Sequence, residues 1–497
     1  MTELNHTLEQ IEDSLNPDDF NGTSVPFEFP IQVDEASQTV TVAAGIPQRE
    51  LLEYLSEYGS GWTLPAFSYF IDQTIGGAVA TGTHGSSFQH GSLSSQVTSL
   101  RLMLANGTVI DVSPDSNPHL FNAAGVSVGR LGIIMDLTMK IVPDKLVERV
   151  TVDTNLLDFA TSVKDVQDAY NAAIAAGDDA GAVRALEQLE ATQAFWHPYD
   201  DIVWRTDYVV LDSAVNASSQ VWNGSDSTAQ DSSIVRVEPI DPFVDPNSRL
   251  TNSGDLLPGV FEQVPNENRV APALAITKNP EVWGRVYTTG LRGMVTPGDF
   301  PANKAYVTMS ETTNQGQASA DPYDQYEASV PFSIAGDCLL GLNELVYGGN
   351  STVKEGFRTP PLIRFVGAEP FYLSPSYGGP VMYINLEDHI SLSSGTENVE
   401  FRSVMRYLLD ECNGRLHWGK AGWPTLWPEF DGAVEYPESW CDFGCAVAEL
   451  DPNGKFRSES DVWRWEATKG GVSVDFSACC SADGFLAREG CECTPRA

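Results

Sequence analysis

Basic residues are scarce in this chain of 497 residues. It holds 29 Lys and Arg against 68 Asp and Glu, which gives a formal net charge of −39 at pH 7. So acidic a surface repels phosphate backbones, which argues against nucleic acid as a partner. Apolar material is not lacking, since hydrophobic residues make up 42% of the chain and aromatic residues 10%. That composition argues against disorder and coiled coil, and at about 150 residues per domain the length predicts two or three domains.

Long apolar runs and a signal peptide are also missing. No stretch approaches the roughly 20 apolar residues of a membrane helix, so the sequence predicts no transmembrane segment. Any association with a membrane would have to occur by another means. Residues 1–17 lack the basic and apolar regions of a secretory signal. Six N-x-[ST] sequons nevertheless favour the secretory pathway or a membrane-associated compartment. They begin at Asn5, Asn21, Asn106, Asn216, Asn223 and Asn350.

The cysteines are concentrated at the C-terminal end, with four of the eight in the last 19 residues. No histidine lies near that group and the C-x2-C spacing of zinc ribbons is absent, so we predict no metal site. Disulfide bonds in an oxidised protein are the favoured interpretation, and reduced thiols are the alternative. The eight are Cys338, Cys412, Cys441, Cys445, Cys479, Cys480, Cys491 and Cys493.

The first 146 residues have the pattern of mixed helix and strand. Residues 38–46 alternate β-branched and small side chains like a strand, and residues 47–58 place leucines at helical spacing after a proline. Residues 97–112 predict a hairpin across an Asn-Gly turn. Residues 132–142 predict a further strand that Pro143 ends.

The rest of the chain changes character several times. Residues 163–193 predict one or two helices, whereas residues 211–270 are rich in Ser, Asn, Asp and Pro and predict long loops. From 280 to 410 strand-like runs alternate with turns, and residues 398–412 predict a helix. Residues 457–497 have the composition of a weakly structured tail.

A glycine-rich segment, residues 72–91, carries the most information. Its five glycines stand among Thr, Ser and His, and bare backbone amides beside hydroxyl groups form a concavity that accepts anions. It matches neither the dinucleotide fingerprint nor the Walker A motif. Composition alone therefore leaves both a cofactor loop and a structural turn open.

Several motifs together resemble the FAD-linked oxidases of the vanillyl-alcohol-oxidase superfamily, in the branch of the sugar-1,4-lactone oxidases. Residues 74–143 resemble the FAD-binding domain most closely, with TIGGAVATGTHGSS at their start. Residues 194–206 and 362–387 resemble the substrate domain. HWGK at 417–420, followed by LDPNG at 450–454, resembles the C-terminal signature of that branch.

The resemblance implies an α+β fold with an FAD-binding domain of the PCMH type. It implies an FAD-binding domain in residues 1–146, and a substrate domain in 147–412 with an antiparallel sheet flanked by helices. Residues 413–456 would return to the active site, and residues 457–497 would form the tail that contains cysteine.

The implied cofactor is FAD. Relatives carry an upstream Gly-x-Gly-His-Ser motif whose histidine binds the flavin covalently, and no such motif occurs in this sequence. We therefore expect the FAD-binding domain to be N-terminally incomplete and covalent attachment to be doubtful. For His84, a turn histidine bonded to backbone is the alternative. The residues that would line the flavin, its pyrophosphate or its adenosine half are Thr74, Ile75, Gly76, Gly77, Thr81, Gly82, Thr83, His84, Gly85, Gly132 and Ile133.

The implied reaction is oxidation of an aldono-1,4-lactone, of the D-arabinono or L-gulono type, with oxygen as acceptor. It would release hydrogen peroxide and an ascorbate-type product. Hydride transfer leaves negative charge on reduced flavin, and Arg364 and Lys420 match positions that face the active site in the family. His417 would orient near Lys420. The alternatives are ion pairs with surplus carboxylates for the two cations and a purely structural turn for HWGK.

Two departures from the family pattern bear on the substrate. Many relatives have an acidic residue two positions before the strand arginine, where this chain has Leu362. Alditol oxidases have a histidine where Ile384 falls, so its absence favours lactones over alditols. An alditol oxidase or a lactone dehydrogenase is the alternative within the same class. A catalytically inactive, secreted binding protein is the alternative of another class.

Overall fold

A computed structural model describes residues 30–59, 61–214, 298–301, 306, 324–391, 395–423, 426–458 and 462–495. Two of the strand-like runs of the region 280–410 lie outside these residues, VWGRVYTTG at 282–290 and, apart from Tyr306, KAYVTMS at 304–310. Most of the expected loop region 211–270 also lies outside them. Within the described residues, no helix combines the length and the apolarity that crossing a membrane requires.

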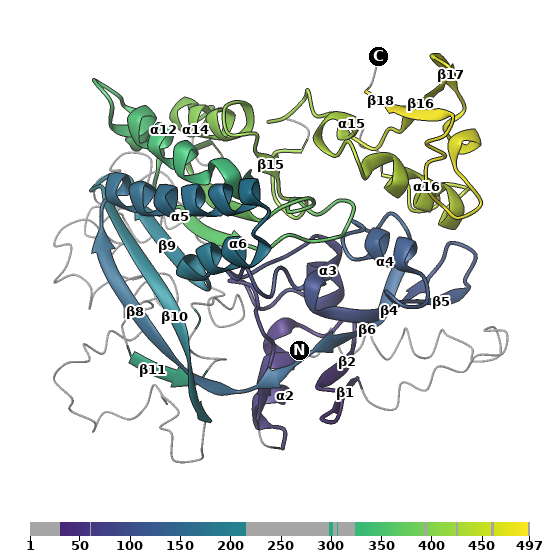
Figure 1. Cartoon of the computed structure of the whole chain (residues 1–497), viewed down its shortest axis with the longest axis horizontal. Coiled ribbons are helices and arrows are strands. Elements are labelled where there is room, and N and C mark those ends of the chain that lie inside the picture. The colour runs from purple at the N-terminus through teal and green to yellow at the C-terminus, as the bar shows by residue number, and fades with distance from the viewer. Residues whose placement is uncertain are drawn as a thin grey trace, which may run out of the picture.

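The N-terminal part is built on a five-stranded antiparallel sheet, ordered β1-β2-β6-β4-β5 (Figure 1). The expected strand and hairpin are confirmed. Strands β4 and β5 pair across the Asn-Gly turn, and β6 pairs with both β2 and β4. The bounds are β1 Ile31–Asp34, β2 Thr39–Ala43, β4 Val97–Met103, β5 Val109–Val112 and β6 Ile133–Lys140.

Three helices accompany this sheet. In α2 the apolar positions Leu51, Leu52 and Leu55 are buried, as their helical spacing predicts. Helix α4 starts because the Asn117 side chain accepts a hydrogen bond from the Leu120 amide and a proline follows at the first helical position. The bounds are α2 Gln48–Glu57, α3 Ile75–Ala80 and α4 Pro118–Ala124, and a separate two-stranded sheet joins β3 Trp62–Thr63 to β7 Val142–Pro143.

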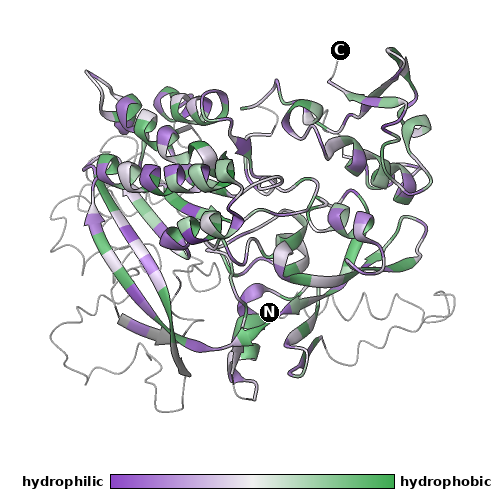
Figure 2. Cartoon of the chain, in the orientation of Figure 1, coloured by the Kyte–Doolittle hydropathy of each residue, from purple (hydrophilic) through white to green (hydrophobic). Residues whose placement is uncertain are grey.

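The second sheet has eight strands, ordered β11-β8-β10-β9-β13-β14-β12-β15. Every recorded pairing in it is antiparallel. Figure 2 shows hydrophilic and hydrophobic residues alternating along β8 and β10, the pattern of strands with two different faces. The bounds are β8 Lys145–Thr154, β9 Thr192–His197, β10 Ile202–Ala214, β11 Gly298–Pro301, β12 Asp324–Pro331, β13 Leu362–Val366, β14 Val381–Asp388 and β15 Arg415–Leu416.

Helices pack on this sheet. Helix α5 begins at Leu156, earlier than the expected 163, because the Asn155 side chain accepts a hydrogen bond from the Asp158 amide. The last two residues of that expected helical range belong instead to β9. The bounds are α5 Leu156–Ala176, α6 Asp179–Leu186, α12 Ala335–Tyr347 and α14 Val399–Asp410, with 3-10 turns η2 Ser94–Gln96, η3 Glu187–Leu189, η6 Phe332–Ile334 and η7 Val353–Gly356.

The expectation of a weakly structured tail is wrong. Residues 466–494 form a three-stranded sheet, and disulfide bonds tie it to helix α16. Covalent links replace the large apolar core that so short a segment cannot build. The bounds are α15 Gly432–Glu435, α16 Trp440–Leu450, β16 Glu466–Lys469, β17 Val472–Val474, η8 Phe476–Cys479 and β18 Cys491–Thr494.

All eight cysteines are paired, which confirms the disulfide interpretation. One bond joins α12 to Cys412, the second residue after α14, and the other three lie within residues 441–493. The pairs are Cys338–Cys412, Cys441–Cys493, Cys445–Cys480 and Cys479–Cys491.

Candidate active site

A polar cleft lies where the first sheet's glycine-rich segment meets the second sheet. The segment after α3 forms one wall, strands β12, β13 and β14 form the floor, and the segment after β15 closes it. Its lining is mostly polar, which suits the reacting end of a small polar molecule. The lining residues are Ser68, Tyr69, Phe70, Gln73, Thr81, Thr83, His84, Gln325, Glu327, Leu362, Arg364, Asn385, His417, Gly419 and Lys420.

A buried ion pair occupies the floor. Arg364 on β13 donates to the backbone oxygen of His84 over 2.8 Å and forms an ion pair with Glu327 on β12. Burial alone would raise the pKa of the Glu327 carboxyl, but the charge of Arg364, with smaller contributions from His84 and Lys420, outweighs it. They hold that pKa well below its usual value, so the pair is charged.

His417 has a fixed tautomer. Its Nδ1 accepts a hydrogen bond from the Gly419 amide over 3.0 Å, so the ring proton is on Nε2. That Nε2–H donates to the backbone oxygen of Gly82 over 3.3 Å. Burial lowers the pKa of His417 to about 3, which keeps the ring neutral at physiological pH. His417 therefore ties the C-terminal segment to the glycine-rich segment.

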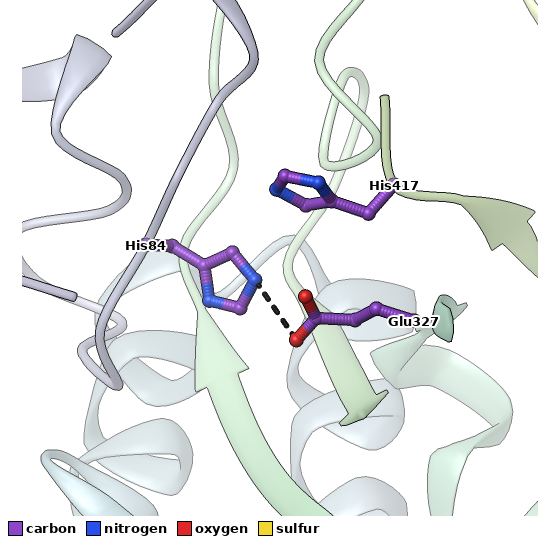
Figure 3. Close-up of side chains that lie close together, drawn as sticks. All are labelled: His84, Glu327 and His417. Atoms are coloured by element: carbon purple, nitrogen blue, oxygen red, sulfur yellow. Dashed lines mark ion pairs between the residues drawn. The ribbon is translucent and has the colours of Figure 1, made fainter. Parts of the chain in front are cut away.

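His84 faces Glu327 from the opposite wall (Figure 3). Its Nδ1 donates to the Gly85 oxygen over 2.9 Å, and its Nε2 lies 3.4 Å from Oε1 of Glu327. The ring stacks on Tyr383, with ring centres 3.7 Å apart. Burial, helped by the charge of Arg364, lowers the pKa of His84. In the neutral ring Nε2 presents a lone pair to the carboxylate, so this contact strengthens when His84 gains a proton.

His84, Glu327 and His417 also have the spacing of a metal-binding set, with their ligand atoms within 4.8 Å of one another. However, the carboxylate is already paired with Arg364, and both nitrogens of His417 are bonded to backbone. Two cations beside the set would repel a dication. The absence of a metal site therefore stays our prediction.

Lys420 is the second cation of the cleft. Its Nζ donates to Oε1 of Gln325 and lies 5.7 Å from the centre of the Phe70 ring. Burial lowers the pKa of Lys420, although the charge of Glu327 opposes that effect. A lysine with a lowered pKa can exchange a proton more readily than an exposed one.

The structure brings the three predicted catalytic residues to one cleft, together with Thr81, Thr83 and His84. It also adds Glu327, Gln325 and Asn385, which sequence reasoning missed. The one signal for Glu327 was a lone acid in an otherwise uncharged run, YEASVPF. The pairing of β12 with β14 was needed to recognise it.

Position 362 holds Leu362 where many relatives have an acidic residue, and Glu327 on β12 places a carboxylate in the same part of the cleft. Glu327 and Leu362 both pair with Asn385 on β14, so the three residues lie abreast across the sheet. Ile384 is fully buried and lies outside the cleft lining, whereas its neighbour Asn385 lines it. The substrate argument based on position 384 therefore concerns a residue that does not face the cleft.

The other predicted cofactor residues fall into two groups. Gly76, Gly85 and Gly132 allow close packing, because a Cβ there would lie 2.6 Å from the Ala44 Cβ, 2.4 Å from the Phe67 oxygen and 2.7 Å from the Met103 oxygen respectively. Gly82 has a φ of +69°, a conformation that favours glycine. Ile75 is buried, whereas Thr74, Gly77 and Ile133 are exposed.

Comparison with known protein families identifies the family of this chain. The FAD-binding-domain family matches residues 18–113, and the D-arabinono-1,4-lactone oxidase family matches residues 300–464. The chain belongs to the FAD-linked sugar-lactone oxidases. These matches include the glycine-rich segment and all three strands of the cleft floor.

Two names recur among proteins similar to this sugar-lactone oxidase. An L-gulonolactone oxidase of Scyliorhinus torazame is 28% identical over 86% of this chain and 81% of its own length. A D-arabinono-1,4-lactone oxidase of Yarrowia lipolytica is 29% identical over 45% and 40%. An L-gulonolactone oxidase of Mus musculus is 41% identical over 23% and 25%. In the last two the match spans less than half of the relative's length.

Solved structures of low identity share the fold. The cholesterol oxidase of Brevibacterium sterolicum has a TM-score of 0.58 at 13% identity, over 85% of this chain and 80% of that chain. A solvent-stable cholesterol oxidase has a TM-score of 0.55 at 15% identity, over 86% and 82%. These likenesses support the α+β fold, and the family match to residues 18–113 supports the FAD-binding domain of the PCMH type.

The residues present fit FAD. Thr74 stands at the start of α3 and is exposed, and its side chain caps no helix amide. Gly77 and Gly45 are exposed nearby, and a Cβ at Gly45 would meet nothing within 4 Å. The Ile75 and Gly76 amides of α3 already donate to the backbone oxygens of Ile46 and Ala44, so the exposed backbone of Gly45 and Gly77 and the Thr74 hydroxyl are the groups that suit a pyrophosphate. The cations of the cleft suit a ring that gains negative charge.

Proposed function

We propose that this protein is an FAD-dependent oxidase of an aldono-1,4-lactone, of the D-arabinono or L-gulono type. Oxygen is the electron acceptor, and the products are an ascorbate-type compound and hydrogen peroxide. The observation that carries this proposal is the charged cleft of Arg364, Glu327 and Lys420 against the glycine-rich segment. The names of the relatives supply the substrate class.

Bound FAD would supply the acceptor for the hydride of the substrate carbon. Arg364 and Lys420 stabilise negative charge at that end of the cleft, and Glu327 holds Arg364 in place. Lys420 Nζ is the group that takes the hydroxyl proton, because its lowered pKa makes the neutral amine accessible. The amides of Gln325 and Asn385 offer hydrogen bonds to the lactone hydroxyls.

The test is substrate-dependent oxygen consumption by the FAD-loaded chain. D-arabinono- and L-gulono-1,4-lactone are compared with xylitol, and a dye acceptor without oxygen separates oxidase from dehydrogenase. Lys420→Met should lower kcat by about 100-fold or more, since one general acid–base group contributes about that much. Lys354→Met is the matched control, because Lys354 lies over Tyr199 outside the cleft. Equal loss in both variants, or faster xylitol turnover, would contradict the proposal.

We also propose that the protein matures in the secretory pathway or in a compartment continuous with it. Four disulfide bonds account for all eight cysteines, and such bonds persist in oxidising compartments. Alkylation of the protein before and after reduction, in cells that make it naturally, tests this. Thiols that react without reduction would show that the bonds do not form there.

A further inference from the structure

Two of the six sequons lie within the described residues, and both are in exposed turns. The sequon at Asn106 forms the turn between β4 and β5, and the sequon at Asn350 follows helix α12. In Figure 1, β5 and α12 lie on opposite sides of the molecule. Neither Asn lines the catalytic cleft.

The turn at Asn106 is held by its backbone and by the Asn106 side-chain oxygen, and it does not use the side-chain nitrogen. The amide of Gly107 donates to the Leu104 oxygen over 2.9 Å, and the amide of Leu104 donates to the Thr108 oxygen over 2.8 Å. Oδ1 of Asn106 accepts from the Thr108 amide over 2.9 Å, while Nδ2 bonds to no other described residue. A Cβ at Gly107 would meet nothing within 4 Å, so there is room around this turn for a bulky group.

The turn at Asn350 is held without the asparagine side chain, through different hydrogen bonds. The Gly348 amide donates to the Glu344 oxygen over 2.8 Å, and the Ser351 hydroxyl donates to the Leu345 oxygen over 2.7 Å. Asn350 is exposed and its side chain bonds to no other described residue. A Cβ at the neighbouring Gly349 would also meet nothing within 4 Å. Neither turn depends on the asparagine amide nitrogen for its shape.

We propose that Asn106 and Asn350 each carry an N-linked glycan. Exposure, open space and an unused Nδ2 occur together at both sequons, and the four disulfide bonds indicate the compartment in which such glycans are added. Nδ2 forms a bond to the anomeric carbon of an oligosaccharide carried on a lipid pyrophosphate. The bond from that carbon to the pyrophosphate oxygen breaks, the lipid pyrophosphate leaves, and Nδ2 loses one proton.

The glycan on Asn106 also has a structural consequence. Among the residues that the structure describes, strand β5 is at the end of the five-stranded sheet and pairs only with β4, so its other side has no strand partner there. Such an edge can pair with another chain, and bulky or charged groups beside it suppress that pairing. A glycan at the start of β5 covers the approach to this edge.

The experiment uses the full chain, directed by a cleavable leader into the endoplasmic reticulum of a eukaryotic host. Intact mass and peptide maps are recorded before and after peptide N-glycosidase, with hydrolysis in oxygen-18 water to mark each released asparagine. Thr108→Ala and Thr352→Ala should each remove one glycan, because each destroys one sequon. Thr108→Ser and Thr352→Ser are the matched controls and should keep both glycans. Both positions are exposed on the surface, and a melting curve confirms folding.

The readouts separate glycosylation from the deamidation to which Asn-Gly pairs are prone. Deamidation before the enzyme step carries no oxygen-18 label and does not depend on the hydroxyl of Thr108. Disulfide-bonded, folded protein with unmodified Asn106 and Asn350, whether secreted or retained in the cell, would overturn the proposal. A glycan at one position alone would overturn it for the other.

Discussion

At the residue scale, the cleft depends on two buried charges that come from different strands. Glu327 and Arg364 are both almost fully buried, so each would be costly to bury without the other. Arg364 also donates to the backbone of His84, and it thereby fixes the glycine-rich segment against the floor of the cleft. The pair therefore has a structural and an electrostatic role.

Glu327→Gln tests both roles. It leaves Arg364 buried without its counter-charge, so we expect a loss of stability of about 3–5 kcal/mol and a fall in lactone kcat of about 100-fold or more. Chemical denaturation and steady-state kinetics measure the two effects. Glu369→Gln is the matched control, because Glu369 is an equally buried carboxylate that binds serines such as Ser92 outside the cleft. It should lose stability but keep its turnover per folded molecule.

His417 predicts a pH dependence of stability. In the unfolded chain its pKa is near 6.5, whereas burial lowers the folded value to about 3. Between these values the unfolded state binds more protons than the folded state. Each pH unit of acidification from about pH 6.5 towards pH 3 therefore lowers the free energy of unfolding by about 1.4 kcal/mol. Denaturation at several pH values measures it. His417→Gln should flatten the profile over that window, and an unchanged slope would show that His417 does not cause it.

At the scale of elements, the glycine-rich segment is shaped by packing as much as by ligand contact. Gly85 lies against the backbone of Phe67, while the following Ser86 donates to the Thr192 oxygen on β9 and accepts from the Phe365 amide on β13. The segment is thus clamped between the first sheet's loops and the second sheet. Its position decides where His84 stands.

Gly85→Ala is expected to disturb the site without touching a catalytic group. The new Cβ would lie 2.4 Å from the Phe67 oxygen, so the segment must shift. Overpacking of this kind costs about 1–3 kcal/mol, and we expect weaker FAD binding and a lower kcat. Gly379→Ala is the control, because a Cβ there meets nothing within 4 Å. Flavin titration and melting curves measure the effects, and identical behaviour of the two variants would contradict this interpretation.

At the scale of the whole molecule, FAD retention is the property to test. The chain has seven histidines, and none stands in a Gly-x-Gly-His-Ser motif. His84 is buried with its Nδ1 bonded to Gly85. We therefore expect the flavin to be bound non-covalently. After acid denaturation and electrophoresis the protein band should show no flavin fluorescence, and the released flavin should appear in the supernatant. Apoprotein reloaded with FAD is the control, and a fluorescent band would refute the expectation.

The sequence alone determined the family, the FAD-binding fold, the disulfide state and three of the cleft's charged or polar groups. These depend on local pattern: strand alternation, the Asn-Gly turn, the THG and HWGK motifs and the cysteine count. Arg364, His417 and Lys420 stood out because each lies in a motif that can be recognised along the chain.

Only the tertiary structure decided the partners of those residues. Glu327 is 37 residues from Arg364 and Gly82 is 335 residues from His417, and no local pattern encodes such contacts. They follow from the register of β12 on β14 and from the return of the segment after β15. The C-terminal module was misjudged for the same reason. Its sheet is stabilised by disulfide bonds to a helix that precedes it, and composition does not show which cysteines meet.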